Sequence, residues 1–253
     1  MKKVLLLLAS AVVAFAACQE KPDDNGGIID DNGGNGGNNT GTVASLAGSN
    51  YYPILMDAVT FDKIKDKVAA DLRAQDGGDE NSTRPLYVWA GYAGAEAAGL
   101  NFYGNAEGFT CFSVTGTAGW SGFGIFLKKS DAGFAKMAEL AKGGYYLHFA
   151  YRGPAGVAHC LYPAWGGKEY RMSIGDGEKF VDQGNAYEFL APISNGGRFV
   201  ANEWNEYEIA LSDTGLDFTA PAAEEGGQNI FCGLSGNVAG TLLQIDAVFF
   251  YKK

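Results

Sequence analysis

The sequence of 253 residues is poor in the residue types on which several functional classes depend. It has only two histidines, and neither has a partner at a spacing that suits zinc, which argues against catalysis at a histidine metal cluster. Its 19 basic residues face 29 acidic ones, the formal net charge is −10, and the basic residues form no cluster. Because phosphate contacts need lysine and arginine, the chain is a poor candidate for binding nucleic acid. A Gly-x-Ser-x-Gly motif is also absent, so that kind of serine nucleophile is not predicted.

Cysteine is scarce as well, with four in the chain. Cys18 ends the N-terminal apolar region, and the other three, Cys111, Cys160 and Cys232, are widely spaced and form no Cys-x-x-Cys pair. We interpret these three mainly as small buried hydrophobic residues. One disulfide is compatible with an oxidising compartment, and the sequence does not assign its partners.

Long apolar runs are confined to the N-terminus, where Lys2 and Lys3 precede a stretch from Val4 to Ala17. The stretch is shorter than the ~20 residues that a membrane-spanning helix needs, and its pattern is typical of a secretory signal peptide. The letters "FAAC" resemble a bacterial lipobox, in which cleavage leaves Cys18 as a lipidated N-terminus. We therefore predict a lipoprotein signal peptide over 1–17, and the alternative is an ordinary signal peptide cut near Ala17.

Residues 18–45 have almost no apolar side chains and carry three Gly-Gly pairs. This composition cannot bury a core and predicts a flexible tether. The acidic run near its start resembles the export signal of surface lipoproteins in Bacteroidetes; the alternative is a solubilising leash. Loss of Lys2 and Lys3 with the signal peptide would change the net charge from −10 to −12.

Residues 46–253 are rich in glycine and aromatic residues, with many short strand-like runs between Gly-rich turns. No internal repeat of fixed period is present, and strands do not alternate regularly with helices. We predict an all-β domain, an antiparallel β-sandwich or jelly roll with one or two short helices. The helices are expected over 56–72 and 131–144. The strands are expected over 86–92, 100–104, 108–116, 120–128, 145–152, 157–165, 169–175, 186–190, 204–211, 228–234 and 242–251.

Aromatic and planar polar side chains come together in "LYPAWGGKEYR", which contains Tyr162, Trp165, Glu169 and Arg171. Sugar recognition needs an aromatic face for the C–H side of a pyranose and planar polar groups for its hydroxyls. Pro163 and the two glycines place Trp165 at a strand end, where it is either an exposed stacking platform or a plug of the core.

The remaining tryptophans and histidine also allow two interpretations. Trp204 shares the polar side of its strand with Glu206 and Glu208, and Trp120 lies between glycines, so both are candidate ligand residues as well as packing residues. Trp89 lies in an apolar run and is expected in the core. His148 is expected to be a hydrogen-bonded sheet histidine rather than a ligand.

Several strand-sized motifs resemble a known family: "NFYG", "GWSGFGI", "YYLHFAYR", "EWNEYEIALSD" and "LSGNVAGTLLQIDAVFFYKK". They resemble Bacteroidetes surface lipoproteins with a jelly-roll domain that is similar to carbohydrate-binding modules of the galactose-binding-like type. The resemblance implies a lipid anchor in the outer membrane and exposure at the cell surface. It also implies a polysaccharide or oligosaccharide partner and a structural Ca²⁺ held by a carboxylate near the last strand, where Asp246 is the matching residue. Backbone N–H groups or a lysine would satisfy Asp246 equally well.

The sequence thus leads to one main hypothesis and two alternatives. The main hypothesis is a non-catalytic, surface-anchored glycan-binding lipoprotein that captures polysaccharide. The first alternative is a scaffold lipoprotein that binds other envelope proteins. The second is a glycoside hydrolase, for which Glu206 and Glu208 on one strand face would lie ~7 Å apart, within the range such enzymes use.

Overall fold

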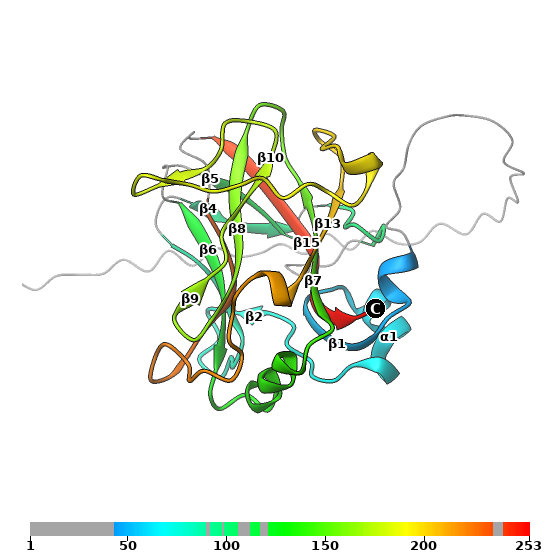
Figure 1. The fold of residues 1–253 in the computed structure, drawn as a ribbon, viewed down its shortest axis with the longest axis vertical. Helices are drawn as coiled ribbons and strands as arrows, with labels where there is room; N and C mark the ends of the chain where they lie inside the picture. The colour runs from blue at the N-terminus through cyan, green and yellow to red at the C-terminus, as the bar shows by residue number, and fades with distance from the viewer. Residues whose placement is uncertain (1–42, 90–91, 98, 106–111, 117–120, 235–239) are drawn as a thin grey trace, which may run out of the picture. The chain divides into compact units, whose positions relative to one another are not determined.

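Two antiparallel sheets form the fold in the computed structural model, which describes residues 43–253 except 90–91, 98, 106–111, 117–120 and 235–239 (Figure 1). The first sheet has the order β13-β7-β15-β5-β4, with β1 also paired to β15. Its strands are β1 (Ser49–Leu55), β4 (Tyr92–Ala97), β5 (Phe112–Gly116), β7 (Tyr145–Arg152), β13 (Asn205–Ala210) and β15 (Thr241–Lys252).

The second sheet has the order β10-β8-β14-β6-β3-β2, with β9 also paired to β8. Its strands are β2 (Gln75–Asp76), β3 (Pro85–Val88), β6 (Gly122–Lys128), β8 (Ala158–Trp165), β9 (Lys168–Glu169), β10 (Met172–Gly175) and β14 (Gly227–Leu234). A small hairpin, β11 (Val181–Asp182) and β12 (Asn185–Ala186), follows β10. All named pairings are antiparallel except that of β2 with β3. The predicted antiparallel β-sandwich of jelly-roll type is confirmed.

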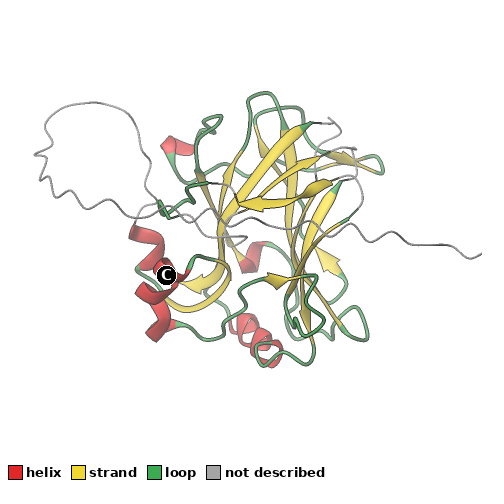
Figure 2. Ribbon diagram, turned by 180° about the vertical axis from the view of Figure 1, so that it is seen from behind, coloured by secondary structure: helices red, strands yellow, loops and turns green. Residues whose placement is uncertain are grey.

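Helical segments are short and lie at the margins of the strands (Figure 2). They are α1 (Ala58–Ile64) and the 3₁₀ segments η1 (Val43–Leu46), η2 (Lys65–Lys67), η4 (Phe134–Lys142), η5 (Asn195–Gly197) and η6 (Leu211–Asp213). Asp57 caps α1 by accepting from the N–H of Thr60 at 2.8 Å. The helix predicted over 56–72 is too long, because Leu72 instead donates its N–H to the carbonyl of Pro53 in β1. Among the residues with described positions, no helix is long and apolar enough to cross a bilayer.

Most strand predictions over 120–252 agree with the structure to within two residues, but three predictions are wrong. The run 86–92 divides, because β3 ends at Val88 in the second sheet and β4 begins at Tyr92 in the first. Residues 100–104 form a turn, since the side chain of Asn101 accepts from the N–H groups of Tyr103 and Asn105. The run 186–190 is not a strand either, because β12 ends at Ala186. In addition, β1 was not predicted.

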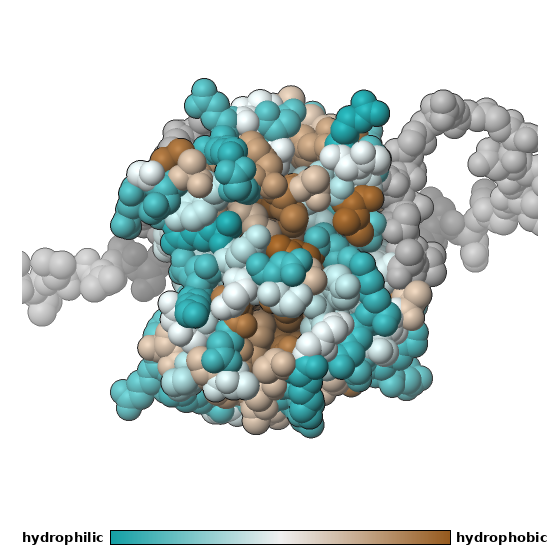
Figure 3. All heavy atoms as spheres, in the orientation of Figure 1, coloured by the Kyte–Doolittle hydropathy of each residue, from teal (hydrophilic) through white to brown (hydrophobic). Residues whose placement is uncertain are grey.

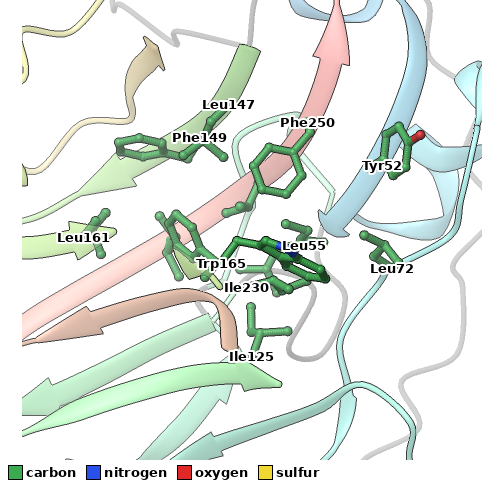
Figure 4. Close-up of a cluster of buried hydrophobic side chains, with 14 of the residues drawn as sticks. Tyr52, Leu55, Leu72, Ile125, Leu147, Phe149, Leu161, Trp165, Ile230 and Phe250 are labelled. Carbon is green, nitrogen blue, oxygen red and sulfur yellow. The ribbon is translucent and has the colours of Figure 1, made fainter. Parts of the chain in front are cut away.

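The core lies between the two sheets and is formed by the side chains on the inner face of each (Figure 4). Leu147 and Phe149 of β7 meet Leu161 of β8 and Phe231 of β14, and the rings of Phe149 and Phe231 are 6.0 Å apart. Leu147 and Phe149 lie on the inner side of β7, as the alternation of side chains along a strand requires. In the view of Figure 3, apolar atoms form a band between hydrophilic margins, in the region where Figure 1 shows the edge strands β10 and β13.

Candidate ligand-binding face

The outer face of the second sheet carries two rows of cross-strand partners. The first row joins four neighbouring strands and consists of Tyr162, Cys232, Gly124 and Tyr87. The second row consists of Cys160, Leu234 and Gly122, and Trp89 donates its N–H to the carbonyl of Gly122 at 3.0 Å. Strands are about 4.8 Å apart, so each row is roughly 14 Å long between its outer residues. Side chains alternate along a strand, and the intervening residues lie in the core, so both rows face outward.

Two glycines of β6 support the aromatic end of this face. A Cβ atom added to Gly122 would lie 1.7 Å from the indole of Trp89, and one added to Gly124 would lie 2.7 Å from the hydroxyl of Tyr87. Both rings therefore rest directly on backbone, 5.8 Å apart between centroids and tilted by 43°. They are half-buried, and the Tyr87 hydroxyl donates to the side-chain oxygen of Asn229 at 2.7 Å.

The prediction that Trp89 belongs to the core is wrong, and the alternation of residues along its strand already indicates why. Tyr87 and Trp89 alternate with Leu86 and Val88, and this period of two puts the aromatic rings on the face opposite to the core. The alternation of Gly122 and Gly124 with Phe123 on the partner strand carries the same signal. Because aliphatic and aromatic residues alternate within one apolar run, apolar character alone gave no sign that the aromatic residues face away from the core.

The polar end of the face is built around Arg171. Its guanidinium donates to Glu169 at 2.7 Å and to Asp182 at 2.5 Å, and its carbon lies 5.1 and 5.6 Å from the ring centroids of Tyr162 and Tyr187. Both carboxylates raise the pKa of Arg171, although partial burial opposes them. Arg171, Glu169, Asp182 and Tyr187 line an open pocket of about 320 Å³, and Tyr162 lies buried beneath the guanidinium. Three of the predicted residues, Tyr162, Glu169 and Arg171, therefore lie together beside a cavity, and the Asp182 and Tyr187 that join them were not predicted.

Small apolar groups fill the middle of the face. Cys160 and Cys232 are free thiols, and Phe180 and Tyr187 pack against them from the segment after β10. Burial raises the pKa of each thiol to about 12, so both are protonated and unreactive at neutral pH. The prediction of small buried hydrophobic cysteines is confirmed for this pair, and Cys111 lies outside the described residues.

Trp165 does not belong to the candidate face. The side chain is 3 % exposed, points into the core from the end of β8, and lies 5.9 Å from Phe218 and 5.4 Å from Phe134 between ring centroids. Its indole N–H donates to the carbonyl of Ala220 at 3.1 Å, so its one polar atom is satisfied inside the protein. Figure 4 shows it surrounded by core side chains. The platform interpretation of Trp165 is wrong, because the alternation of β8 directs Tyr162 outward and Trp165 inward.

Trp204 is also excluded from a ligand platform. It is 7 % exposed, its ring lies under the guanidinium of Arg152 at 4.6 Å, and its N–H points to the carbonyl of Leu100 at 3.4 Å. The residues around 100–103 cover it, which its position on a polar strand face did not reveal. Trp120 and Cys18 lie outside the described residues.

Glu206 and Glu208 lie on the outer side of β13, in the first sheet, away from the candidate face. Glu206 is hydrogen-bonded to Nε2 of His148 at 2.8 Å. Glu208 contacts the hydroxyl of Tyr251 and the ammonium of Lys253. Each carboxylate thus already has partners within the chain.

Asp246 is fully buried next to a β-bulge of β15. One of its carboxylate oxygens accepts from the N–H of Phe102 at 2.9 Å, and the other has no hydrogen-bond partner. Burial, together with the carboxylate of Asp57, raises the pKa of Asp246 to about 7, although the backbone N–H groups of Ala247 and Phe102 oppose the shift. The orphaned carboxylate oxygen of Asp246 fits the oxygen preference of Ca²⁺. Both oxygens of Asp57, by contrast, already accept hydrogen bonds from Thr60, Asn101 and Asn105. No group of three or more His, Cys, Asp or Glu residues is found in the described part of the chain, so further ligands would be backbone or amide oxygens or water.

Comparisons with known proteins give no family for this chain. No family model matches it, and no curated protein matches it. Among solved structures it is similar to the family 11 carbohydrate-binding module of the cellulosomal cellulase Lic26A-Cel5E of Clostridium thermocellum, with 13 % identity, a TM-score of 0.36 and coverage of 70 % of this chain and 92 % of that one. It is also similar to SGBP-B from a complex xyloglucan utilization locus in Bacteroides uniformis, with 13 % identity, a TM-score of 0.35 and coverage of 68 % and 48 %. A family 30 carbohydrate-binding module aligns with 12 % identity, a TM-score of 0.30 and coverage of 56 % and 76 %. Because these values are low, the similarity by itself indicates no ligand.

Proposed function

We propose that this protein is a non-catalytic glycan-binding protein and that its site is the outer face of the second sheet. The observation that carries the proposal is that the rings of Tyr87 and Trp89 pack directly on Gly124 and Gly122. The two cross-strand rows to which they belong lead towards the polar end of the face. An aromatic ring offers a flat apolar surface to the C–H face of a pyranose. Arg171, Glu169 and Asp182 offer donors and acceptors for hydroxyls at the far end.

The arrangement suits an extended ligand that lies across the strands. Gly124 has no side chain, so the surface beside Tyr87 is low. Tyr162 and Cys232, by contrast, are buried under Phe180 and Tyr187. A chain of sugars would lie over Tyr87 and Trp89 and extend towards Arg171, with weak contacts repeated along its length. Hydrolysis is not part of the proposal, because the acid pair considered for it lies on the other sheet.

The test is affinity electrophoresis and calorimetry of the protein against a panel of plant and host polysaccharides. We expect retardation by at least one glycan and its loss in Trp89→Ala. A matched control is Tyr146→Ala, which removes a half-buried ring from the other sheet and should leave retardation unchanged. Failure of every glycan to retard the wild-type protein would instead support a scaffold that binds envelope proteins.

The cellular setting is a second part of the proposal. The pattern of Lys2 and Lys3, the apolar run and Cys18 supports cleavage and lipidation, with the domain held at the surface of the outer membrane by residues 18–45. Cys18→Ala should release the protein from the membrane fraction. An unchanged fractionation would contradict a lipid anchor.

Calcium is proposed as a structural ion at Asp246. An ion that binds the folded state at about 100 times its Kd adds about 2.7 kcal/mol to the free energy of unfolding. For a domain of this size this corresponds to roughly 5–10 °C in Tm. Chelation should therefore lower Tm by that amount, and added Ca²⁺ should restore it. Asp246→Asn should abolish the response; a wild-type Tm that is indifferent to chelation would refute the site.

A further inference from the structure

A larger cavity lies on the outer side of the first sheet, away from the candidate glycan face. Its volume is about 660 Å³. It is bounded by residues 45–48 before β1, by residues 193–195 before β13, by Phe102 and by the C-terminal Lys253. Its floor is the edge strand β13 and the end of β15. Segments from five parts of the chain thus build one concave site.

Apolar and acidic groups share this cavity. Phe102 is 2 % exposed, whereas Ile193 is 53 % exposed at the margin, and both line the cavity together with Ala47. Glu206 and Glu208, two residues apart on β13, point to the same side and are both largely buried. A concave, mostly apolar site with a few oriented polar groups is the general form of a small-molecule site.

The deeper carboxylate, Glu206, has a partner within the sheet. Nε2 of His148 lies 2.8 Å from it, and Nδ1 of the same ring lies 2.8 Å from the carbonyl of Ala247. Both ring nitrogens therefore face oxygen atoms, so the carboxylate of Glu206 already has a hydrogen-bond partner within the sheet. The ring of Phe249 stacks on His148, with 4.4 Å between the centroids.

The outer carboxylate, Glu208, has a different partner. The side chain of Glu208 is 7 % exposed, but its cation, the ammonium of Lys253, belongs to the last residue and has a side chain that is 55 % exposed. The same ammonium lies 4.2 Å from the ring centroid of Tyr146, and the Tyr251 hydroxyl donates to Glu208. A carboxylate beside the face of an aromatic ring is a binding site for an ammonium group. Because the side chain of Lys253 is half exposed, its ammonium can leave Glu208 for solvent when another cation takes its place.

We propose that this cavity binds a primary amine with an apolar body, whose ammonium displaces Lys253 from Glu208 and Tyr146. The apolar body would extend between Phe102 and Ile193, where the cavity has no competing charge to satisfy. Lys253 would then turn outward into solvent, which its exposed position permits. The site is separate from glycan binding and does not depend on it.

Calorimetry with two matched probes tests the proposal: 4-phenylbutylamine and 4-phenylbutanol share their apolar body and differ in the terminal group. We expect the amine to bind wild-type protein at least tenfold more tightly than the alcohol. Lys253→Met should strengthen amine binding several-fold, because the competing ammonium is gone. Glu208→Gln should reduce the preference to less than twofold.

Other outcomes would overturn the proposal. These are equal affinities of wild-type protein for the two probes, no binding of either probe, or a preference that survives in Glu208→Gln. If Glu208→Gln fails to fold, Tyr146→Leu takes its place and should weaken the preference several-fold through loss of the ring face. Trp89→Ala is the matched control from the opposite sheet and should bind both probes like the wild type.

Discussion

The two outer faces of the sandwich are built from the same alternation of side chains but differ in what lies over them. On the second sheet, small residues and glycines leave the rings of Tyr87 and Trp89 half-buried at the surface. On the first sheet, α1 and the turn around Phe102 pack over the aromatic residues, so that Phe249 and Trp204 form a second buried cluster. An aromatic residue on an outward face is therefore a ligand platform only where no other segment of the chain covers it.

The largest expected effect comes from exchanging one tryptophan on each face for alanine. Trp204→Ala removes a buried indole and should lower the free energy of unfolding by about 3–5 kcal/mol, without changing glycan affinity of the folded protein. Trp89→Ala should cost less than about 2 kcal/mol, because its ring is only half-buried, yet should abolish glycan binding. Chemical denaturation and affinity electrophoresis on both variants measure the contrast. Equal destabilisation by the two would contradict the distinction between a covered and an open face.

The second effect is a pH dependence of stability that arises at His159, in the interior between the two sheets. His159 is fully buried, its Nδ1 is hydrogen-bonded to the hydroxyl of Tyr151 at 2.7 Å, and burial lowers its pKa to about 3. The unfolded chain binds this proton near pH 6.5, so the unfolded state holds more protons across the window between these two values. The free energy of unfolding should therefore fall as the pH is lowered below about 6.5, by roughly 3 kcal/mol at about pH 4.

His159→Phe isolates this contribution, because it retains a ring of similar size and removes the titration. Urea denaturation at several pH values should give a shallower decline for the variant than for the wild type. Parallel curves would mean that the acid sensitivity comes from other groups, such as the paired carboxylates. The absolute stability of the variant does not enter the comparison, since only the slope with pH is read.

A smaller change should affect the open face alone. Gly122→Ala places a methyl group where the indole of Trp89 now lies, 1.7 Å from its nearest atom, so the ring must move off the sheet. The cost in the free energy of unfolding should be about 1–3 kcal/mol, as for other overpacked sites, and glycan affinity should fall at least tenfold. Gly226→Ala is the matched control, because a Cβ atom there meets nothing within 4 Å. Unchanged glycan binding by Gly122→Ala would remove Trp89 from the site.

The smallest effect on stability is expected at the margin of the covered face. Lys253→Met breaks the pair with Glu208, and because the lysine is exposed the free energy of unfolding should change by less than about 1 kcal/mol. Thermal unfolding of the variant measures this. A loss of several kcal/mol would show that Lys253 is a structural partner of Glu208 and not a displaceable one.

The strands with clear alternation could be predicted closely from the sequence, and the candidate site only in part. β7 shows Leu147 and Phe149 on one side in the sequence and in the core, and this local pattern is sufficient because one face must be buried. Tyr162, Glu169 and Arg171 could be grouped because they are near one another along the chain. Asp182 and Tyr187 could not, since a hairpin returns them to Arg171 from a distance that no local pattern encodes.

The sequence by itself determined that the chain folds into an antiparallel β-sandwich, which residues face in or out along its clearest strands, and that neither a histidine metal cluster nor nucleic acid is indicated. Tertiary structure alone decided which outward faces remain open. Trp204 became buried while Trp89 stayed at the surface, although both indoles lie on outward faces. The physical reason is that the exposure of an outward side chain depends on the segments that pack over it, and the segment around Phe102, which covers Trp204, comes from a distant part of the chain.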